Sequence, residues 1–398
     1  MRVPSVCHYT FSTSGGAGRV AVQLSNGLND FGLESHIKSI TEGDIRDCVF
    51  THPVLSSRAL IDFYLVRKSR DQHLFTLFRE ADGVKIEDQP HLIHHLHWTP
   101  GVATLSQIGQ LIRGKNPTIW TLHDMWPFTG GCHHAMNCEG YTRNCSACPQ
   151  ARGIYSRLVE QSLNSKKQNF SRSQKFVAIT PSNWLKDQAV NSEIFNGCEI
   201  KVVSNPIDTD RFSPAIGQIR DITDKLVIGC NATNLLDPMK GVSALIEELE
   251  KFQHQNPSLK VVLLAIGEGD LSSQLIEIEK TGYLADQQLI ASAYSKMDVF
   301  ISLSKAEVFP LSIAEAQSCG LPVICLNSGG MPEMIQQSIN GFVVTQPSDL
   351  LQVLGQFIRP ETNRKEMQVS ARRHALANYS TNVVIKQYID IYSALISD

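Results

Sequence analysis

The chain has 398 residues, of which 42% are hydrophobic and 19% charged, so it can form the cores of two or three domains. Its net charge of −3 gives no overall attraction to a polyanion, and nucleic acid is therefore not an expected partner. No apolar run approaches the roughly 18 to 20 residues that cross a bilayer, and no signal-peptide core follows Met1. We expect a cytoplasmic protein that is at most peripheral on the inner face of the plasma membrane.

The first half of the chain alternates predicted strands with predicted helices. A strand near 3–9 is followed by a glycine loop at 12–18 and by a helix that closes at Gly32. Further strands are predicted at 37–40, 91–97, 118–122 and 176–179. This alternation indicates a parallel sheet covered by helices.

The glycine loop contains Gly15 and Gly16, and a relaxed Gly-x-Gly-x-x-Ala pattern starts at Gly16. A nicotinamide site is a weak interpretation, because several residues separate the pattern from the predicted strand and only Glu42 offers the acidic residue that such a site needs. We interpret the segment as a flexible loop near acceptor and phosphate groups.

The stretch 58–79 mixes aromatic and leucine residues with basic ones. Such a helix can lie on an anionic membrane surface. The alternative is a core helix with a solvated basic face, and the sequence favours this second interpretation.

Histidines follow two of the predicted strands. His94, His95 and His97 resemble a metal-binding set, but alternate sides of a strand separate them, so we do not expect a metal there. His123 ends the strand 118–122 in the context Thr-Leu-His-Asp, which favours a functional role over a structural one.

Four of the ten cysteines fall in one polar segment, 130–150. They are Cys132, Cys138, Cys145 and Cys148. Three states remain open: structural zinc, which the Cys-x-x-Cys spacing of the last pair suggests; disulfides, which a reducing compartment disfavours; and free thiols.

The second half again alternates strands and helices. Strands are predicted at 226–230, 261–266, 299–303 and 323–326, a new helix is predicted to open at 332–333, and a last helix at 383–395. Asp208-Thr209-Asp210 imitates a metal-binding Asp-x-Asp motif, but its position in a connection predicts a loop cap, and no catalytic metal is expected.

Lys240 and Gly241 follow a strand and a loop and open a helix. A lysine at this position opposes the helix dipole, so an anionic partner is expected nearby, and a diphosphate suits it.

Two glutamates flank the run 308–312 and are predicted to bind different parts of one ligand. Pro310 cannot lie within a helix, so Glu307 belongs to the loop after the strand 299–303, while Ser312 can cap a helix carrying Glu315. Eight residues along a helix would separate the carboxylates by roughly 12 Å, too far for a glycosidase-like pair.

The motifs together resemble a known family. The Glu-x7-Glu element from Glu307, the Gly-Leu-Pro-Val-Ile turn at 320–324 and the Gly-Gly-Met-Pro-Glu loop at 329–333 resemble retaining glycosyltransferases of family 4, glycosyltransferase group 1. The run 120–132, with Cys-Ser-Ala-Cys-Pro-Gln at 145–150, resembles the branch of bacterial exopolysaccharide and colanic-acid biosynthesis.

The resemblance implies an α/β protein of the GT-B fold, with two Rossmann-like domains facing across a cleft. The implied parts are an acceptor-binding domain over 1–205, a linker over 206–224, a nucleotide-sugar domain over 225–380 and a helix over 381–398 that crosses back to the first domain.

The resemblance also implies the roles of individual residues. Lys240 would stabilise the departing nucleotide diphosphate, Glu307 would hold a hydroxyl of the transferred sugar, His123 would touch the donor sugar, and Glu315 would bind the ribose. Asn234 or a neighbour occupies the position at which the family commonly has an arginine shortly before Lys240, and Asn234 is predicted to bind the donor. The remaining predicted donor-binding residues are Phe309, Pro310, Leu311, Gly15 and Gly16.

The implied activity is metal-independent, retaining transfer of a hexose from a nucleotide diphosphate sugar to a glycan or lipid-linked oligosaccharide acceptor. Two alternatives stay open. One is a GT-B hydrolase or epimerase of nucleotide sugars, and the other is a non-catalytic zinc-knuckle module of a polysaccharide assembly complex.

Overall fold

The computed structural model describes residues 5–41, 75–77, 86–87, 89–151, 154–170, 173, 175–215, 222 and 224–397. Contacts divide the chain into two units. Unit 1 comprises Met1–Pro206 and Val384–Asp398, and unit 2 comprises Ile207–Val383. Among the described helices, none combines the length and the apolar composition that crossing a bilayer requires.

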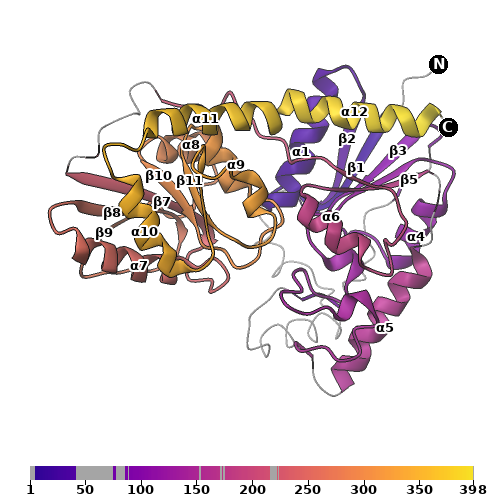
Figure 1. The fold of residues 1–398 in the computed structure, drawn as a ribbon. Coiled ribbons are helices and arrows are strands. Elements are labelled where there is room, and N and C mark those ends of the chain that lie inside the picture. The colour runs from indigo at the N-terminus through magenta and orange to yellow at the C-terminus, as the bar shows by residue number, and fades with distance from the viewer. Residues whose placement is uncertain are drawn as a thin grey trace. The chain divides into compact units, whose positions relative to one another are not determined.

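Unit 1 is built on a parallel sheet of six strands in the order β2-β1-β3-β4-β5-β6 (Figure 1). The strands are β1 (Ser5–Ser12), β2 (Ser35–Thr41), β3 (Leu92–Leu96), β4 (Thr118–Thr121), β5 (Phe176–Thr180) and β6 (Ile200–Val202). The helices are α1 (Gly15–Asp30), α4 (Leu105–Arg113), α5 (Ile154–Asn169) and α6 (Asn183–Val190), with short 3₁₀ turns η1 (Trp126–Phe128) and η2 (Gly140–Thr142). Every residue of β3, β4 and β5 is buried, as expected for a parallel sheet covered on both faces.

The C-terminal helix α12 (Thr381–Ser397) begins in unit 2 and packs, from Val384 onward, against the sheet of unit 1 (Figure 1). Its buried Tyr388 and Tyr392 hydroxyls make hydrogen bonds with Thr121 Oγ1 (3.1 Å) and His95 Nδ1 (2.7 Å). The crossover helix predicted from the sequence is therefore confirmed.

Unit 2 is built on a second parallel six-stranded sheet, in the order β12-β11-β10-β7-β8-β9. The strands are β7 (Lys225–Asn234), β8 (Lys260–Glu268), β9 (Glu277–Lys280), β10 (Val299–Ser302), β11 (Val323–Leu326) and β12 (Gly341–Val344). The helices are α7 (Val242–Gln255), α8 (Gln287–Tyr294), α9 (Leu311–Ser318), α10 (Leu350–Phe357) and α11 (Arg364–Asn378), with 3₁₀ turns η3 (Met331–Met334) and η4 (Pro347–Asp349).

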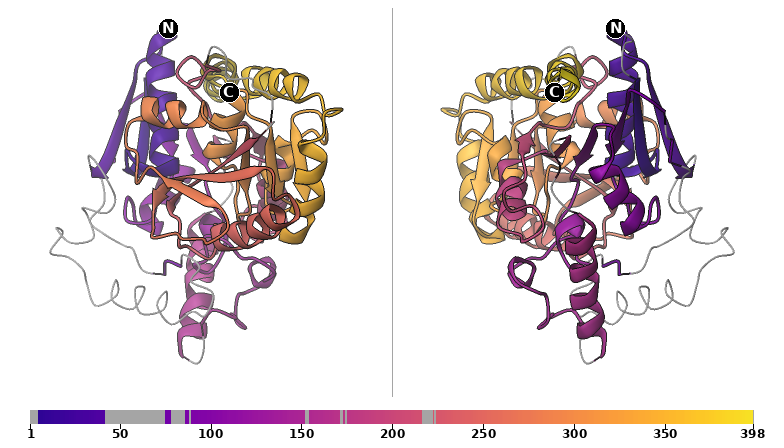
Figure 2. Two further views of the ribbon diagram at one scale, coloured as in Figure 1. Left: turned by 90° about the vertical axis from the view of Figure 1, so that its left-hand side faces the viewer. Right: turned by 90° about the vertical axis from the view of Figure 1, so that its right-hand side faces the viewer.

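Helices cover both faces of the sheet of unit 2 (Figure 2). Alternation along its strands gives this sheet two apolar cores, one on each face. Leu226 and Ile228 of β7 pack with residues of α7 and α10, whereas Val227, between them, packs with residues of α8 and α9. These layers hold the carboxyl ends of the strands in place, and the loops that follow them carry the candidate site.

Strand order reverses once in each unit. In unit 1 the chain leaves β1 for β2 on one side and later returns to place β3 on the other side. In unit 2 the same happens at β7, which lies between β8 and β10. Ligands of open α/β sheets bind at such switch points, outside the carboxyl ends of the strands.

The sequence misplaced three local features. The helix α1 begins at Gly15, so Gly15 and Gly16 form its first turn and not a loop, only two residues after β1. Pro310 and not Ser312 is the N-cap of α9, because Leu311 is already helical and no side chain caps this helix. The helix expected at 332–333 is only the single turn η3.

Two predictions fall mostly on residues that the structure does not describe. The basic amphipathic stretch 58–79 lies outside the described residues except at 75–77, where Phe75 is buried and pairs with Cys132 in an isolated bridge. Glu42, the acidic candidate for a dinucleotide site, also lies outside them.

Candidate functional site

Lys240 occupies the turn between β7 and α7. The N–H of Lys240 donates to the carbonyl of Asp237 (2.9 Å), and Gly241 then starts α7 in the left-handed conformation, with φ of 69°. A Cβ atom at Gly241 would lie 2.2 Å from the carbonyl oxygen of Leu303. Only glycine fits both constraints, so the turn is fixed against the end of β10.

Glu307 lies in the loop between β10 and α9, the neighbouring strand at the switch point. The Lys240 ammonium donates to Glu307 Oε1 over 2.7 Å, and the N–H of Lys305 donates to the carbonyl of Met239 (2.8 Å). The loops that follow β7 and β10 are thus joined by both side chains and backbone.

A third loop, after β11, completes this arrangement. The N–H of Gly330 donates to the carbonyl of Glu307 (2.9 Å), and the Ser328 hydroxyl donates to the carbonyl of Lys305 (2.5 Å). Gly329 has φ of 58°, and a Cβ there would lie 2.0 Å from the Glu307 carbonyl oxygen. We name the segments 235–241, 304–310 and 327–330 the switch-point loops of unit 2.

The charge of Lys240 is stabilised where it lies. The adjacent Glu307 carboxylate raises the pKa of Lys240 above its usual value, although burial acts in the opposite direction. The anionic partner that the helix position required is therefore Glu307 itself in this structure. The lysine keeps 35% of its side-chain surface exposed, so solvent or a ligand can still reach it.

Glu315 has a different environment from Glu307. It lies on α9 with only 2% of its surface exposed, and its Oε2 accepts a hydrogen bond from the Tyr294 hydroxyl (3.3 Å). Tyr294 also accepts one from Asn231 Nδ2 (3.0 Å), near the end of β7. The two glutamates thus have separate partners within one region of unit 2.

The other residues predicted to bind the donor surround the start of α9 and the end of β7. The Phe309 ring is buried and packs edge-on against Tyr379, so only its backbone can serve a ligand. Pro310 and Leu311 form the N-terminus of α9, whose first N–H groups have no partner within the helix. Asn234 ends β7, and its Oδ1 accepts from the N–H of Leu236 (3.0 Å).

In unit 1 the glycines at the first turn of α1 lie at the other switch point. Gly15 has φ of 71°, and among the described residues outside the adjoining turn of α1 no atom lies within 4 Å of a Cβ built at Gly16. A Cβ at Gly18 would instead lie 2.3 Å from the Ser12 carbonyl oxygen. Gly18, which the sequence analysis did not single out, therefore sets how closely α1 approaches β1.

His123 is the end of a chain of three hydrogen-bonded imidazoles. Its Nε2 lies 3.0 Å from His97 Nδ1, and His97 Nε2 lies 2.9 Å from His8 Nδ1. His95 stacks on His97 at 4.2 Å, and its Nε2 lies 2.8 Å from Thr121 Oγ1. Burial lowers the pKa of His8 to about 3 and that of His123 to about 4, so both rings are neutral at pH 7.

The expectation that alternate sides separate the histidines of β3 is correct for His94, which lies beside the Tyr9 hydroxyl (3.3 Å). The expectation missed His8, which β1 contributes in register with His95. The ligand nitrogens of His8, His95 and His97 all lie within 4.8 Å of one another, as do donor atoms of Cys7, His36 and Glu87.

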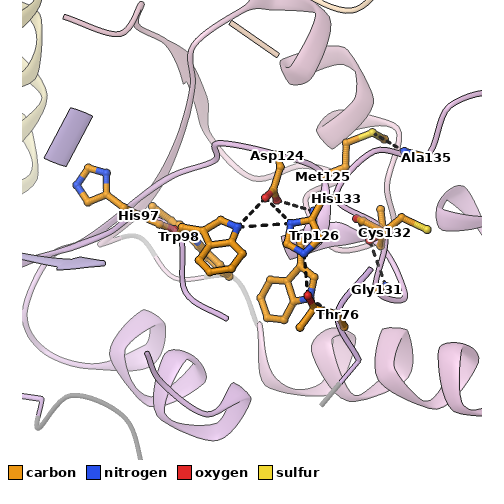
Figure 3. Close-up of polar contacts among 12 residues, drawn as sticks. Thr76, His97, Trp98, Asp124, Met125, Trp126, Gly131, Cys132, His133 and Ala135 are labelled. Atoms are coloured by element: carbon orange, nitrogen blue, oxygen red, sulfur yellow. Dashed lines mark hydrogen bonds and ion pairs between the residues drawn. The ribbon is translucent and has the colours of Figure 1, made fainter. Parts of the chain in front are cut away.

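Asp124 and His133 form a buried pair beside this chain (Figure 3). Asp124 Oδ2 lies 2.6 Å from His133 Nδ1 and accepts the indole N–H of Trp98 (2.9 Å), and Oδ1 accepts the N–H of Trp126 (2.9 Å). Burial alone would raise the pKa of Asp124, but His133 and the Trp126 N–H lower it overall. The pair holds the segment after β4 in a fixed conformation.

Lys166 is fully buried in the same region. Its ammonium donates to the carbonyls of Trp126 (2.6 Å) and Thr129 (2.9 Å) and lies 3.7 Å from the centre of the Trp126 ring. Burial lowers its pKa to about 7. These contacts explain Lys166 as a support for the turn η1.

The four clustered cysteines are free thiols in the structure. Cys132 and Cys148 are hydrogen-bonded to each other, and this contact together with burial raises the pKa of Cys132, while that of Cys148 falls to about 6. Within the described residues, these four cysteines do not belong to a group of three or more metal-binding side chains whose donor atoms all lie within 4.8 Å of one another. Structural zinc at this cluster stays a hypothesis.

Of the residues predicted from the sequence, Lys240 and Glu307 are in direct contact in the structure, and His123 contacts His97. The sequence did not point to His8 or to the Asp124–His133 pair, because their contacts join strands and loops that are distant in sequence. The Thr-Leu-His-Asp motif and the histidines at 94, 95 and 97 were the sequence signals that pointed to this region.

Comparisons with known proteins agree with this architecture. A family model described as Glycosyltransferase Family 4 matches residues 14–211, and one described as Glycosyl transferases group 1 matches residues 226–359. WcaC of Escherichia coli, described as a colanic acid biosynthesis glycosyl transferase, is 24% identical over 96% of this chain and 97% of its own. A D-inositol 3-phosphate glycosyltransferase of Corynebacterium jeikeium is 24% identical over 80% of this chain and 74% of its own.

Two solved structures show the same fold over nearly the whole chain. A glycosyltransferase from Rickettsia africae has a TM-score of 0.63 at 18% identity and covers 100% of both chains. HepE from Anabaena, in complex with UDP, has a TM-score of 0.63 at 15% identity and covers 98% of this chain and 100% of its own. With a family model matched in each half of the sequence and the GT-B fold common to these neighbours, the chain belongs to the glycosyltransferases of group 1 and family 4.

Proposed function

We propose that the protein is a retaining glycosyltransferase that moves a hexose from a nucleotide diphosphate sugar to a lipid-linked glycan in exopolysaccharide biosynthesis. The similarity to WcaC supports the polysaccharide context. HepE has been solved with UDP and with UDP-glucose, so a uridine diphosphate sugar is the first donor to test.

The observation that carries the proposal is the Lys240–Glu307 pair at the switch point of unit 2. An ammonium group has three N–H donors, and Glu307 accepts one of them, which leaves others to bind a diphosphate. The N-terminus of α9 follows directly after this pair and adds N–H groups that have no partner within the helix and favour negative charge.

In the proposed reaction, the bond between the sugar C1 and the phosphate oxygen breaks while the acceptor oxygen bonds to C1 on the same face. The proton of the acceptor hydroxyl passes to an oxygen of the departing diphosphate. Lys240 stabilises the charge that develops on that diphosphate. Glu307 binds a hydroxyl of the transferred sugar, and Glu315 binds the ribose.

The surroundings of the two glutamates favour this route over double displacement. Glu307 is held by Lys240, and Glu315 is almost fully buried beside Tyr294. Neither is an open carboxylate of the kind that attacks a sugar carbon. We further propose that Lys240 and the helix N-terminus act in place of a divalent cation.

The test is a screen of nucleotide sugars by thermal stabilisation, followed by product analysis. A donor at about 100 times its dissociation constant should stabilise the folded state by roughly 2.7 kcal/mol. Transfer to a lipid-linked glycan, with the anomeric configuration of the donor kept in the product and unchanged by EDTA, would support the proposal. Products that form equally without acceptor would instead identify a hydrolase or epimerase.

A further inference from the structure

Three buried imidazoles connect the core of unit 1 to His123. His8 lies in β1, His97 follows β3 and His123 follows β4, and they are joined by nitrogen–nitrogen contacts of 2.9 and 3.0 Å. His8 and His97 are 0% and 2% exposed, whereas His123 is only partly buried. A ligand can therefore bind to this row of imidazoles at His123, its partly exposed end.

Counting the imidazole protons leaves two possible arrangements of the N–H groups along the three histidines. Burial lowers the pKa of all three rings, so each ring carries one N–H at neutral pH. Each of the two contacts needs one N–H, and His97 can supply only one of them. The protons must therefore all point toward His123 or all point toward His8.

The two arrangements differ at the ends of the chain. If the protons point toward His8, the buried Nε2 of His8 carries an N–H, and His123 offers a bare Nδ1. If they point toward His123, His8 Nε2 is a bare acceptor and His123 carries its proton on Nδ1. Within the described residues, His8 Nε2 has no hydrogen-bond partner. In folded proteins a buried N–H group without a partner is rarer than a buried acceptor without one. The arrangement in which the protons point toward His123 is therefore favoured.

We infer that His97 is a positioning residue that holds His123 in the tautomer with its proton on Nδ1, so that His123 donates a hydrogen bond to an oxygen of the bound sugar substrate. The sugar ligand in this inference rests on the proposed function, whereas the tautomer of His123 does not. The Nδ1–H of His97 donates to His123 Nε2, and that of His8 donates to His97 Nε2.

The pairing of the nitrogens favours this account over a metal ion at His8, His95 and His97. Both nitrogens of His97 already contact other imidazoles. Both nitrogens of His95 contact hydroxyl groups, those of Tyr392 (2.7 Å) and Thr121 (2.8 Å). A metal would have to displace one of these contacts at each ring.

The tautomer is tested by NMR on ¹⁵N-histidine-labelled protein without ligand. We expect the His123 proton on Nδ1 in the wild type and a mixture of tautomers in His97→Leu, which removes the donor. His97→Asn should restore the wild-type pattern, because the asparagine amide can donate from nearly the position of Nδ1. His94→Leu is the matched control, since it removes a buried imidazole three residues before His97 that does not belong to the chain of hydrogen-bonded imidazoles, and it should leave the His123 tautomer unchanged.

The role in substrate binding is tested by kinetics on the same variants. His97→Leu should lower kcat about tenfold with a smaller change in KM, and His97→Asn should recover most of that loss. A His123 proton on Nε2 in the wild type, or a transition metal bound stoichiometrically by the three rings, would overturn the inference. An inactive wild type with the proton on Nδ1 would reject the proposed function alone.

Discussion

At the scale of single residues, the contact between Lys240 and Glu307 decides how the diphosphate site works. Lys240→Ala removes the ammonium but leaves a half-exposed site that water can enter. If the lysine stabilises charge on the departing diphosphate, turnover should fall by roughly 10²-fold, as when one preorganised donor is lost. The measurement is kcat with a saturating nucleotide sugar.

The matched control for this variant is Lys305→Ala. Lys305 is exposed and contributes its backbone, not its side chain, to the same loops. It should retain wild-type turnover. Equal turnover in Lys240→Ala and Lys305→Ala would remove Lys240 from the mechanism.

Glu315 gives a separate prediction about binding. Glu315→Gln keeps the shape of a side chain that is 2% exposed, but it replaces an oxygen that accepts hydrogen bonds with an amide group. Hydrogen bonds to a charged group contribute about 1.5–3 kcal/mol, so affinity for the nucleotide should fall by roughly ten- to a hundredfold. Calorimetric titration with the nucleoside diphosphate measures this, with Tyr294→Phe as a control for loss of the neighbouring hydroxyl. Unchanged affinity in Glu315→Gln would show that the ribose binds elsewhere.

A site residue could be predicted from the sequence where its signal is local, but not where it depends on contacts between residues that are distant in sequence. Lys240 and Glu307 each stand next to a strand end and a helix start, and these local features are visible in the sequence. That they touch each other depends on β7 and β10 being neighbours, which no local pattern reveals. His8 gave no signal, because a histidine inside an apolar strand is ordinary until the register places it beside His95.

At the scale of secondary structure, Gly241 joins α7 to the end of β10. Gly241→Ala would put a Cβ 2.2 Å from the Leu303 carbonyl oxygen in a residue with φ of 69°. The left-handed conformation and the clash together should cost about 2 kcal/mol or more of unfolding free energy. Urea denaturation, followed by far-UV circular dichroism, measures it.

Gly355 of α10 is the matched control for that variant. Apart from the backbone of its own helix, no atom of the part of the chain that the structure describes lies within 4 Å of a Cβ built there. Alanine should therefore stabilise the helix by about 0.5–1 kcal/mol. Destabilisation of similar size in both variants would mean that the position of Gly241 is not special.

The elements that sequence predicted well are the central strands, whose long apolar runs mark burial on both faces. The strands that it missed are β6, β9 and β12, which have three or four residues each. The segment of β9, Glu-Ile-Glu-Lys, is mostly exposed and gains its structure from pairing with β8. Tertiary context, not local propensity, forms such edge strands.

At the scale of the whole molecule, the two units share one design. Each has a parallel sheet whose order reverses once, and in each the candidate residues follow the two strands at that reversal or the next strand. The sequence predicted the two sheets from alternating strands and helices. Strand order could not be deduced in this way, because it depends on which strands pair across the chain.

The buried histidines of unit 1 make a prediction about the pH dependence of stability. Burial lowers the pKa of His8 to about 3 and that of His123 to about 4, and those of His95 and His97 also fall well below the value near 6.5 of an unfolded chain. At a pH between the folded-state and unfolded-state pKa values, the unfolded state binds more protons than the folded state, so the free energy of unfolding rises with pH. It is fully present above about pH 6.5 and is lost as pH falls toward 4.

Each imidazole in this window should contribute a slope of about 1.4 kcal/mol per pH unit. The measurement is the free energy of unfolding from pH 7 to pH 4 in wild type and in His8→Phe. His8→Phe, which cannot be protonated, should show a shallower slope, and hydrogen exchange should show the sheet of unit 1 losing protection as pH falls. An identical slope in the two proteins would mean that His8 is solvated or protonated in the folded state, and the buried hydrogen-bonded chain would then have to be abandoned.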